Sequence, residues 1–585
     1  MKRAGLTLLD VVLSIGIIGL LFGAIFLAYS SILDASSNAE LRTVASTVLN
    51  RHVEVTRNLP YDQVGTVSGV PSGVIPTEQT STISGVQFLV KTTVRSIDDP
   101  FDGTIGGTPN DTAPADYKFV ELEVSCLTCR HFIPLTLTTT VAPRGLEAAS
   151  QDGSLFVNAF DTSGRSVGSA NVHVSNASVT PLIDLFDITN ASGVLQLVGV
   201  PTSTQRYAIE VTKSGYSSEK TYLPGAPANP NPLKPHATVA AQTVTQLSFT
   251  IDKVSTIKVK SLDLFCASKP DADFNYQGAK LIGTSPDVLK LSTSSRTAAS
   301  GEVTLANIEW DSYSFTLAEP GVDLLGSIPL LPILVNPDSN LDLWFVVASS
   351  SPSSLLVTVK DDTTGLGVPS ATVNLSRTGF SETLLTGRSS FGQTDWSGSQ
   401  YSSQSGGIDA ESLLGALKLI ANASGTYPTS TTHWLVSNTF DVGSSTSAFY
   451  RISWDPVSQP PQTGTDSLKF QLASNNDNAT WNFVGPDGTS ATYYTISSST
   501  VVGHNGRRYF RYQVSMRTAD ENTTPSLNEL TFEFSGACVP KYQVLFDGLS
   551  QTTYTVTVSA VGYGQETRSV TISTSSAATE ILLTP

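Results

Sequence analysis

The sequence predicts a mainly β, multidomain protein whose domains follow one long N-terminal helix. Three observations predict this fold class. The chain opens with an apolar run, only 14% of its 585 residues are charged, and strand-like segments rich in Val and Thr recur between turn-forming residues, which include 44 glycines and 31 prolines. This length allows about four domains, each with its own hydrophobic core.

The charge balance excludes one class of partner. Lysine and arginine total 34 against 50 aspartates and glutamates, which gives a formal net charge of −16. Because a nucleic-acid-binding surface needs a basic footprint, we expect no nucleic acid as a partner. Low charge with an acidic isoelectric point suits an exported surface protein.

The N-terminal run is long enough to cross a membrane. Lys2 and Arg3 precede it, and no charged residue lies between Asp10 and Asp34. A helix crosses a bilayer in about 20 residues, and basic residues flanking it stay in the cytoplasm. We therefore expect one transmembrane segment at about 10–32 in the cytoplasmic membrane, with the bulk of the chain outside the cytoplasm.

Asp10 separates the possible meanings of this run. A secretory signal peptide has a shorter apolar stretch followed by a small-residue cleavage site, and no clear site of that kind follows here. An ordinary anchor leaves Asp10 unexplained, because a carboxylate in a membrane helix costs roughly 2.5–3.5 kcal/mol on insertion scales. Such a residue usually has a partner.

The string Gly5-Leu-Thr-Leu-Leu-Asp10-Val-Val resembles the class III leader of type IV pilins and type II secretion pseudopilins. The resemblance implies that residues 1–5 are a leader, which a prepilin peptidase cuts after Gly5 before methylating Leu6. It also implies that Asp10, the fifth mature residue, pairs with the terminal amine of a neighbouring pilin subunit. Leu6 replaces the usual phenylalanine, and Asp10 replaces the usual glutamate and is one methylene shorter. An ordinary anchor is the alternative.

The helix is expected to extend over residues 6–60. Beyond the membrane, apolar residues recur at the spacing of one helix face, and Pro60 ends the pattern. This face consists of Leu41, Val44, Ala45, Val48, Leu49 and His52. We expect it to pack against a sheet, with His52 as a packed or half-exposed histidine rather than a ligand.

Residues 61–147 are expected to form a small antiparallel sheet on this helix, as in the heads of the pilins that the leader resembles. Three strand-like runs predict it, at 86–95, 117–125 and 133–141, and a turn-rich loop at 98–116 separates the first two. Cys126 and Cys129 lie between two of these strands. A lone C-x-x-C can be half a zinc site, a redox motif or a tight disulfide. Because no second pair and no βαβ pattern occurs, we interpret it as a disulfide.

Three β-sandwich modules are expected after the head. Residues 150–252 alternate apolar and polar residues between Asp/Gly turns and resemble the carboxypeptidase regulatory-like, transthyretin-like β-sandwich, without a zinc-peptidase ligand set. Residues 253–349 follow the same scheme more loosely. The third module is split, since residues 353–389 match its first half and residues 537–585 its second half.

Residues 390–536 are then a domain inserted into the third sandwich. They contain four of the six tryptophans and resemble a discoidin or galactose-binding-like jelly roll. In such folds, loops at one rim bind sugars through aromatic platforms and polar side chains. The candidates here are Trp434, Trp454, Trp481, Arg507 and Arg508. The alternative is that the tryptophans fill the core and the arginines are structural.

No cofactor is predicted, and calcium is the one metal for which a stretch of sequence offers ligands. Asn475, Asn476, Asp477 and Asp487 form a turn-rich acidic stretch, but it lacks the spacing of an EF-hand. Cys266 and Cys538 lie in different modules, and the sequence leaves open whether they are bonded or free.

The leading functional hypothesis is a non-enzymatic minor pilin or pseudopilin that joins or caps a type IV pilus or type II secretion filament and displays β-modules at the cell surface. The alternative is a surface adhesin whose jelly roll binds glycans or a cell surface. An enzyme is the third hypothesis. Residues 164–168 read G-x-S-x-G, but a turn and a strand are expected after them instead of a helix, and no carboxylate-pair or H-E-x-x-H motif occurs.

Overall fold

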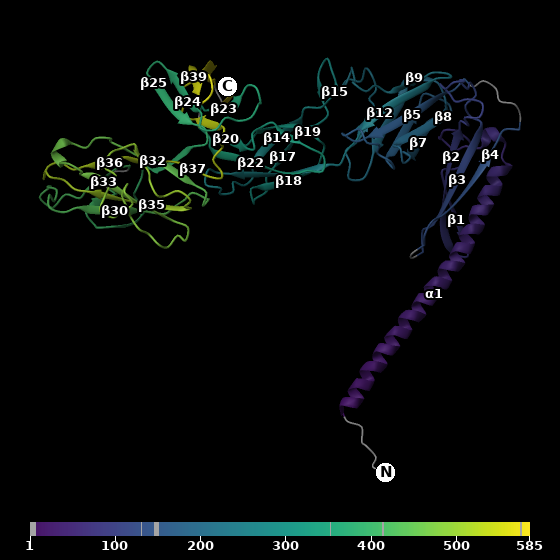
Figure 1. Cartoon of the computed structure of the whole chain (residues 1–585), viewed down its shortest axis with the longest axis horizontal. Helices are drawn as coiled ribbons and strands as arrows, with labels where there is room; N and C mark the ends of the chain where they lie inside the picture. Colours follow the sequence, from purple (N-terminus) through teal and green to yellow (C-terminus); the bar gives the residue numbers. More distant parts are fainter. Residues whose placement is uncertain (1–7, 130–131, 145–150, 352, 412–414, 574–575) are drawn as a thin grey trace, which may run out of the picture. The chain divides into compact units, whose positions relative to one another are not determined.

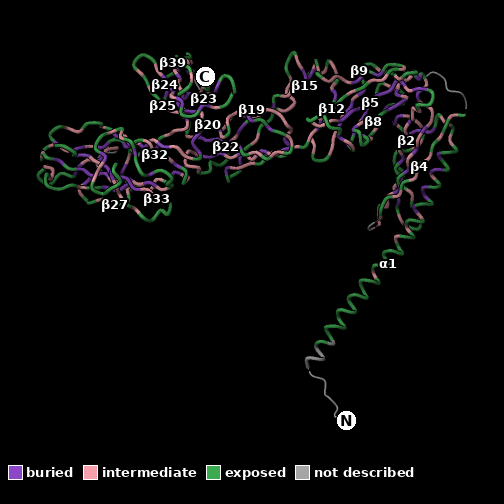
Figure 2. The backbone as a smooth tube through the Cα atoms, viewed as in Figure 1, coloured by how far each residue is buried: buried purple, intermediate pink, exposed green. Residues whose placement is uncertain are grey.

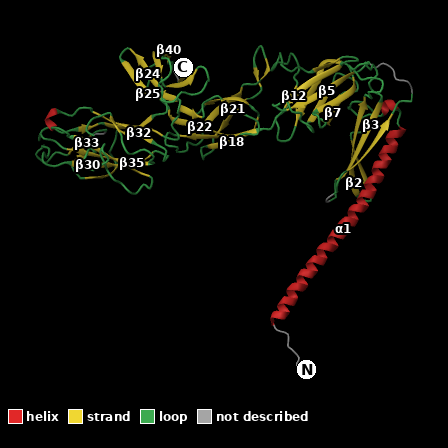
Figure 3. Ribbon diagram, in the orientation of Figure 1, coloured by secondary structure: helices red, strands yellow, loops and turns green. Residues whose placement is uncertain are grey.

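The computed structural model describes residues 8–129, 132–144, 151–351, 353–411, 415–573 and 576–585. It confirms the fold class, because all regular secondary structure of the described residues is β-strand apart from the N-terminal helix and two short 3-10 turns (Figure 3). The strands group into two compact units. Unit 1 comprises residues 1–254 with 281–289, and unit 2 comprises residues 255–280 with 290–585.

A single long helix, α1 (Leu8–Asn58), opens unit 1 (Figure 1). It ends just before Pro60, which cannot continue a helix, and the 3-10 turn η1 (Tyr61–Gln63) follows. Its N-terminal part is apolar and exposed, as the green tube in Figure 2 shows, whereas one side of its C-terminal part is buried. The buried apolar side chains are Ala45, Val48, Leu49 and Val53, with Leu41 and Val44 partly buried beside them. The predicted apolar face is therefore confirmed, with His52 half-buried at its edge.

The helix packs on an antiparallel sheet of order β1-β2-β3-β4. The strands are β1 (Glu78–Ile83), β2 (Val86–Ile97), β3 (Tyr117–Cys126) and β4 (Leu135–Val141). Alternate side chains of β2 and β3 are buried against the helix, among them Phe88, Val94 and Val120. The edge strand β1 was not predicted, because only three strands were expected in the head. Its sequence EQTSTI has no buried residue, so pairing with β2 rather than an apolar pattern makes it a strand.

The first β-sandwich follows the head within unit 1. Its sheets have the orders β12-β5-β8 and β10-β9-β6-β7, with β11 paired to β9. The strands are β5 (Gly153–Phe160), β6 (Asn171–Asn176), β7 (Ile183–Ile188), β8 (Val194–Val200), β9 (Ser203–Thr212), β10 (Glu219–Lys220), β11 (Ala237–Val239) and β12 (Val244–Thr250). The hairpin of β15 (Leu281–Gly283) and β16 (Val288–Leu289) also belongs to this unit, where the Asn229 side-chain amide donates to the Ile282 carbonyl at 3.0 Å.

The head and the first sandwich form one packed body. Val70, from the head, is a member of the buried core of the sandwich. The Arg95 guanidinium on β2 donates two hydrogen bonds to the Asp187 carboxylate on β7, at 2.6 and 3.1 Å. The Asp184 amide donates to the Ser68 carbonyl at 2.8 Å. The buried side chain of Val70 and the bidentate ion pair between Arg95 and Asp187 thus hold the two modules together.

The second sandwich opens unit 2. Its sheets have the orders β18-β13-β22-β20 and β17-β14-β19-β21. The strands are β13 (Ser255–Leu262), β14 (Asp273–Gly278), β17 (Ser292–Arg296), β18 (Glu302–Ile308), β19 (Asp311–Leu317), β20 (Val322–Ile328), β21 (Ile333–Val335) and β22 (Asn340–Ser349).

The third sandwich is assembled from two distant segments. Its sheets, β38-β23-β41 and β25-β24-β39-β40, pair strands near residue 360 with strands beyond residue 540. The strands are β23 (Leu355–Asp361), β24 (Thr372–Arg377), β25 (Phe380–Leu385), β38 (Gln543–Phe546), β39 (Thr553–Ser559), β40 (Glu566–Thr571) and β41 (Ala577–Leu583).

The three sandwiches share one topology. In each, the first strand pairs in parallel with the last strand, as β5 does with β12, β13 with β22 and β23 with β41. Each also has a buried threonine whose hydroxyl accepts a hydrogen bond from an alanine amide at the start of the second strand. The pairs are Thr189 with Ala170, Thr297 with Ala272, and Thr386 with Ala371, at 2.8–2.9 Å. The modules are therefore structural repeats.

The inserted domain occupies one turn of this repeat. The turn that joins β7 to β8 in the first sandwich, and β17 to β18 in the second, is replaced in the third by the chain between β25 and β38. A surface turn tolerates such an insertion because its ends already lie close together.

The inserted domain packs two larger sheets and one small sheet around a single core. Their orders are β26-β37-β32-β34, β27-β30-β35-β31 with β33 on β35, and β28-β29-β36. The strands are β26 (Ser389–Gln393), β27 (Tyr401–Gln404), β28 (Ile408–Asp409), β29 (Leu417–Leu419), β30 (His433–Ser437), β31 (Phe440–Asp441), β32 (Ala448–Asp455), β33 (Leu468–Asn475), β34 (Ser499–Thr500), β35 (Tyr509–Met516), β36 (Ser526–Leu527) and β37 (Glu529–Ser535), with the 3-10 turn η2 (Pro461–Thr463). Aromatic rings dominate its centre, where Phe391 lies within 5.3 Å of both Phe532 and Phe534.

Candidate functional site

The leader residues lie at the edge of the described chain. Gly5 and Leu6 fall outside the described residues, and Asp10 lies within α1, whose described backbone begins at Leu8. The helical segment Ile15–Asn58 is both long enough and apolar enough to cross a membrane, and its most apolar window has a mean hydropathy of 2.2. None of that window is buried by the rest of the protein. A helix that is apolar all round and uncovered by protein has the surface that a lipid environment solvates.

The two halves of α1 therefore have different surroundings. Leu20, Phe22 and Phe26 are 78%, 69% and 71% exposed, whereas Ala45 and Val48 are at most 2% exposed. One continuous helix thus carries an exposed apolar segment and a segment that forms the spine of a sheet. Because the helix is continuous, the head is rigidly connected to the exposed apolar segment.

The predicted glycan-binding tryptophans do not form one platform. Trp454 is 5% exposed, and its ring lies 4.6 Å from that of Phe470 in the core, which excludes it as a ligand platform and corrects that prediction. Trp434 on β30 is 37% exposed. Trp481 is half-buried, and the Arg511 guanidinium lies 4.4 Å from its ring centre. Among the described residues no ring contact joins Trp434 to Trp481.

The predicted arginines have separate roles. Arg508 forms a two-pronged ion pair with Asp441, at 2.8 and 2.9 Å, which raises the pKa of its guanidinium and lowers that of the carboxyl. Arg507 is exposed. Arg508 thus links the start of β35 to β31 through its ion pair with Asp441. The arginine that contacts a tryptophan is Arg511, which was not among the predicted site residues.

In the acidic stretch considered for calcium, the side chains stabilise local turns by hydrogen bonds. The Asp477 carboxylate accepts hydrogen bonds from Ala479 and Thr480, and the Asp487 carboxylate accepts them from Thr489 and Thr492. These bonds lower the pKa of both carboxyls. Asn475 similarly accepts from the Asn478 amide at 2.8 Å. The carboxylate oxygens are thus occupied by local donors, and neither aspartate belongs to a group close enough to share an ion among the described residues.

Both cysteine pairs are disulfides. Cys126 and Cys129 are bonded at the end of β3, as the sequence analysis expected. Cys266 and Cys538 are also bonded, across a sequence separation of 272, which resolves the alternative that the sequence left open. Beside this bond, the Phe265 ring lies 5.8 Å from that of Phe534 and packs on the core of the inserted domain. Within unit 2, the second sandwich is thus covalently joined to the inserted domain.

A group of three aspartates in the head was not among the predicted site residues. Asp98, Asp111 and Asp116 lie in the loop between β2 and β3, and one carboxylate oxygen of each lies within 4.8 Å of the others. Asp111 is 8% exposed. Burial raises the pKa of Asp98, and the negative charges of Asp111 and Asp116 add to that rise.

Each of these three carboxylates has one occupied and one free oxygen. The occupied oxygens accept hydrogen bonds from backbone amides of the same loop, those of Ile105 (2.9 Å), Ala113 (2.8 Å) and Asp99. The other oxygens, Asp98 Oδ1, Asp111 Oδ2 and Asp116 Oδ1, are buried without a hydrogen-bond partner. The sequence signal was available, because residues 98–116 contain five aspartates.

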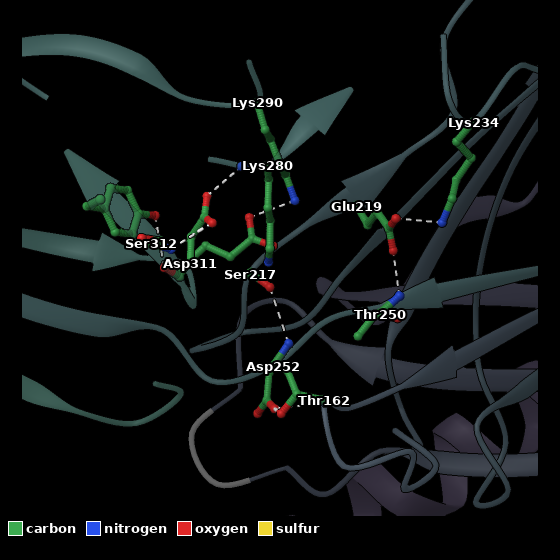
Figure 4. A network of polar contacts seen from close by, with 12 residues as sticks. Thr162, Ser217, Glu219, Lys234, Thr250, Asp252, Lys280, Lys290, Asp311 and Ser312 are labelled. Carbon is green, nitrogen blue, oxygen red and sulfur yellow. Dashed lines mark hydrogen bonds and ion pairs between the residues drawn. The ribbon is translucent and has the colours of Figure 1, made fainter. Parts of the chain in front are cut away.

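Polar networks elsewhere brace individual modules (Figure 4). In unit 1, Glu219 accepts from the Lys234 ammonium and the Thr250 amide, both at 2.5 Å. In unit 2, Lys280 and Lys290 both pair with Glu309, at 2.8 and 2.6 Å. The lysines in these networks are paired with carboxylates, which is the arrangement of structural ion pairs rather than of a nucleophile or base awaiting a substrate.

His504 in the inserted domain provides a pH-dependent stability. Burial lowers its pKa to about 4, and the charge of Arg507 adds to the shift. Because an unfolded histidine titrates near 6.5, the unfolded state binds a proton that the native state does not, between about pH 6.5 and 4. The contribution of neutral His504 to the free energy of unfolding is therefore fully present above pH 6.5. It is lost as the pH falls, and the loss reaches about 3 kcal/mol at pH 4.

We expect denaturant unfolding followed by tryptophan fluorescence to show this loss, because all six tryptophans lie in unit 2. The His504→Gln variant should lose that share of the pH dependence, since glutamine can keep the bond to Ser474 that the Nδ1 atom makes at 2.9 Å. An identical pH slope in the two proteins would contradict the assignment.

No protein-family model matches the chain, and no curated protein matches it. Among solved structures, it is similar to the Bacillus anthracis TIE protein, with 9% identity over 87% of this chain and 73% of that chain and a TM-score of 0.16. It is also similar to the Streptococcal ancillary pilin, with 9% identity over 74% and 98% and a TM-score of 0.15. A third is GBS52, the minor pilin of Streptococcus agalactiae, with 7% identity over 34% and 96% and a TM-score of 0.17. At these values no activity or partner is carried over.

Proposed function

We propose that the chain is a non-enzymatic minor pilin or pseudopilin, anchored by α1 in the cytoplasmic membrane, cut after Gly5 and assembled with other pilin subunits. The observation that carries the proposal is the division of α1 between an exposed apolar half and a half that is the spine of a four-stranded antiparallel sheet. A subunit that leaves the bilayer to enter a filament must exchange lipid for neighbouring helices. An apolar half that its own domains leave uncovered allows that exchange.

The leader motif supplies the chemistry of this proposal. Leu6 would become the methylated N-terminus, and Asp10 would pair with the terminal amine of a neighbouring subunit. A carboxylate in an apolar helix needs such a partner, because an unpaired charge in a membrane is costly. The three sandwiches and the inserted domain would then be carried outside the cytoplasm, where disulfides persist.

The test is co-expression with a prepilin peptidase, followed by mass spectrometry of the N-terminus. We expect a mature chain that begins with a methylated Leu6, and no processing of the Gly5→Leu variant. The matched control Ala4→Ser, on the other side of Gly5, should be processed normally. An N-terminus at Met1, or cleavage at another residue, would refute the proposal.

Asp10→Asn separates cleavage from assembly. We expect this variant to be cut and methylated like the wild type, because the cleaved bond is unchanged. Its recovery in sheared filaments should fall at least tenfold, because the amide carries no charge to pair with a terminal amine. Equal incorporation of both proteins would show that Asp10 has no assembly role.

A further inference from the structure

The loop between β2 and β3 holds three carboxylates whose charges the described protein does not balance. Asp98, Asp111 and Asp116 each keep one buried oxygen without a donor. Among the described ion pairs, none links a lysine or arginine to these carboxylates. Buried polar atoms are nearly always satisfied in native proteins, and a buried unpaired charge costs several kcal/mol. Three such atoms in one loop therefore favour a shared positive partner.

The spacing indicates what that partner is. Calcium binds carboxylate oxygens at about 2.3–2.6 Å, so that two ligands of one ion lie at most about 5 Å apart. The three aspartates meet this limit, with oxygens within 4.8 Å of one another. Magnesium is usually held by only one or two carboxylates and keeps several of its waters, so a group of three carboxylates favours calcium. Thiol and imidazole ligands for softer metals are absent from the group.

We propose that Asp98, Asp111 and Asp116 bind one calcium ion in the head, with Asp111 as the most deeply buried ligand. The occupied oxygens already orient the carboxylates, because each is fixed by a backbone amide of the same loop. The ion would use the free oxygens, and waters or loop carbonyls would complete its coordination. This site is distinct from the acidic stretch of the inserted domain and goes beyond the proposed pilin function.

The position of the loop gives the ion a structural role. Asp98, Thr104 and Ile105 line a cavity shared with Ile188, Asn190 and Leu195 of the first sandwich. A Cβ atom added at Gly106 would lie 3.5 Å from the Val244 side chain on β12, so the loop lies beside that sandwich. Calcium would therefore fix the loop at the joint between head and first sandwich, beside the ion pair of Arg95 and Asp187.

Calcium binding is tested on the full-length chain in detergent, after treatment with a chelator, by isothermal titration with CaCl2. We expect binding of one ion to the loop with sub-millimolar affinity, and Asp111→Asn to weaken that binding at least tenfold. Asp102→Asn is the matched control, because Asp102 is an exposed aspartate of the same loop. No binding by the wild type, or unchanged binding by Asp111→Asn, would overturn the site and indicate that protons neutralise the carboxylates.

Thermal unfolding guards against a variant that simply fails to fold. In chelator, Asp111→Asn should melt at or above the wild-type temperature, because it removes one of three mutually repelling charges. In calcium, only the wild type and Asp102→Asn should gain stability. A variant that melts lower than the wild type in chelator would contradict the predicted repulsion.

The role at the joint has its own measurement. Nitroxide labels at Thr138 of the head and Ser163 of the first sandwich, both exposed, report the distance between these modules by electron–electron resonance. Calcium should narrow the distance distribution of the wild type and leave that of Asp111→Asn unchanged. Equal widths with and without calcium in a wild type that binds the ion would overturn the joint role.

Discussion

A chain in which Cys266 and Cys538 are both replaced by serine is expected to lose about 5 kcal/mol of unfolding free energy in unit 2. The bond closes a loop with a sequence separation of 272, and in the chain-entropy model the stabilisation grows with the logarithm of loop length. It also holds Phe265 against the core of the inserted domain. The measurement is guanidinium unfolding followed by tryptophan fluorescence, with both proteins kept under oxidising conditions.

The second disulfide is the matched control. Cys126 and Cys129 are separated by three positions, so their bond restricts the unfolded chain less, by about 2 kcal/mol in the same model. They also lie in unit 1, which has no tryptophan. Serine at both positions should therefore leave the tryptophan-monitored transition unchanged. If this double variant shifted that transition more than the Cys266 and Cys538 variant does, the assignment would be wrong.

Replacing Trp454 with alanine is expected to destabilise the inserted domain by about 3–5 kcal/mol, the cost of truncating a large buried aromatic residue. The side chain is 5% exposed, and its ring packs against Phe470 at 4.6 Å. Truncation leaves a cavity that the surrounding strands cannot close, because β32 is fixed by its pairing with β37. Differential scanning calorimetry, together with the fluorescence of the remaining tryptophans, measures this loss of stability.

Trp434→Ala is the comparison, because this tryptophan is 37% exposed on β30. We expect it to cost about 1 kcal/mol or less, since much of its surface is already in water. The pair distinguishes a core residue from a surface residue among two tryptophans that the sequence predicted to share one role. A larger loss for Trp434→Ala would show that the burial of these residues has been assigned incorrectly.

Local periodicity predicted the parts of the fold that depend on it. The buried residues of α1, such as Ala45 and Val48, follow the helical repeat, and the strands of the head that face them alternate in burial. The polar edge strand β1 could not be predicted, because its conformation comes from its partner. The match between the second half of one repeat and the C-terminal segment predicted a split module, and the pairing of β23 with β41 is the arrangement it requires.

Long-range proximity accounts for most of what the sequence concealed. Nothing local to Cys266 indicates Cys538, since the bond depends on how the second sandwich meets the inserted domain. The aspartates of the head are a milder case. Ile97 pairs with Tyr117 in the register of β2 and β3, which places the neighbouring Asp98 and Asp116 side by side. Two of the three carboxylates were thus deducible from strand register, whereas Asp111 depends on the path of the loop.

The parallel pairing of first and last strands determines how each sandwich responds to tension. In the first sandwich, β5 and β12 are paired side by side over seven residue pairs and run in the same direction. A pull on the incoming and outgoing chain would act on opposite ends of this ladder, so that it shears all seven pairs together instead of opening them one at a time. The second sandwich repeats this geometry with β13 and β22. In both modules, a pulling force is therefore shared by all hydrogen bonds of the parallel ladder at the same time.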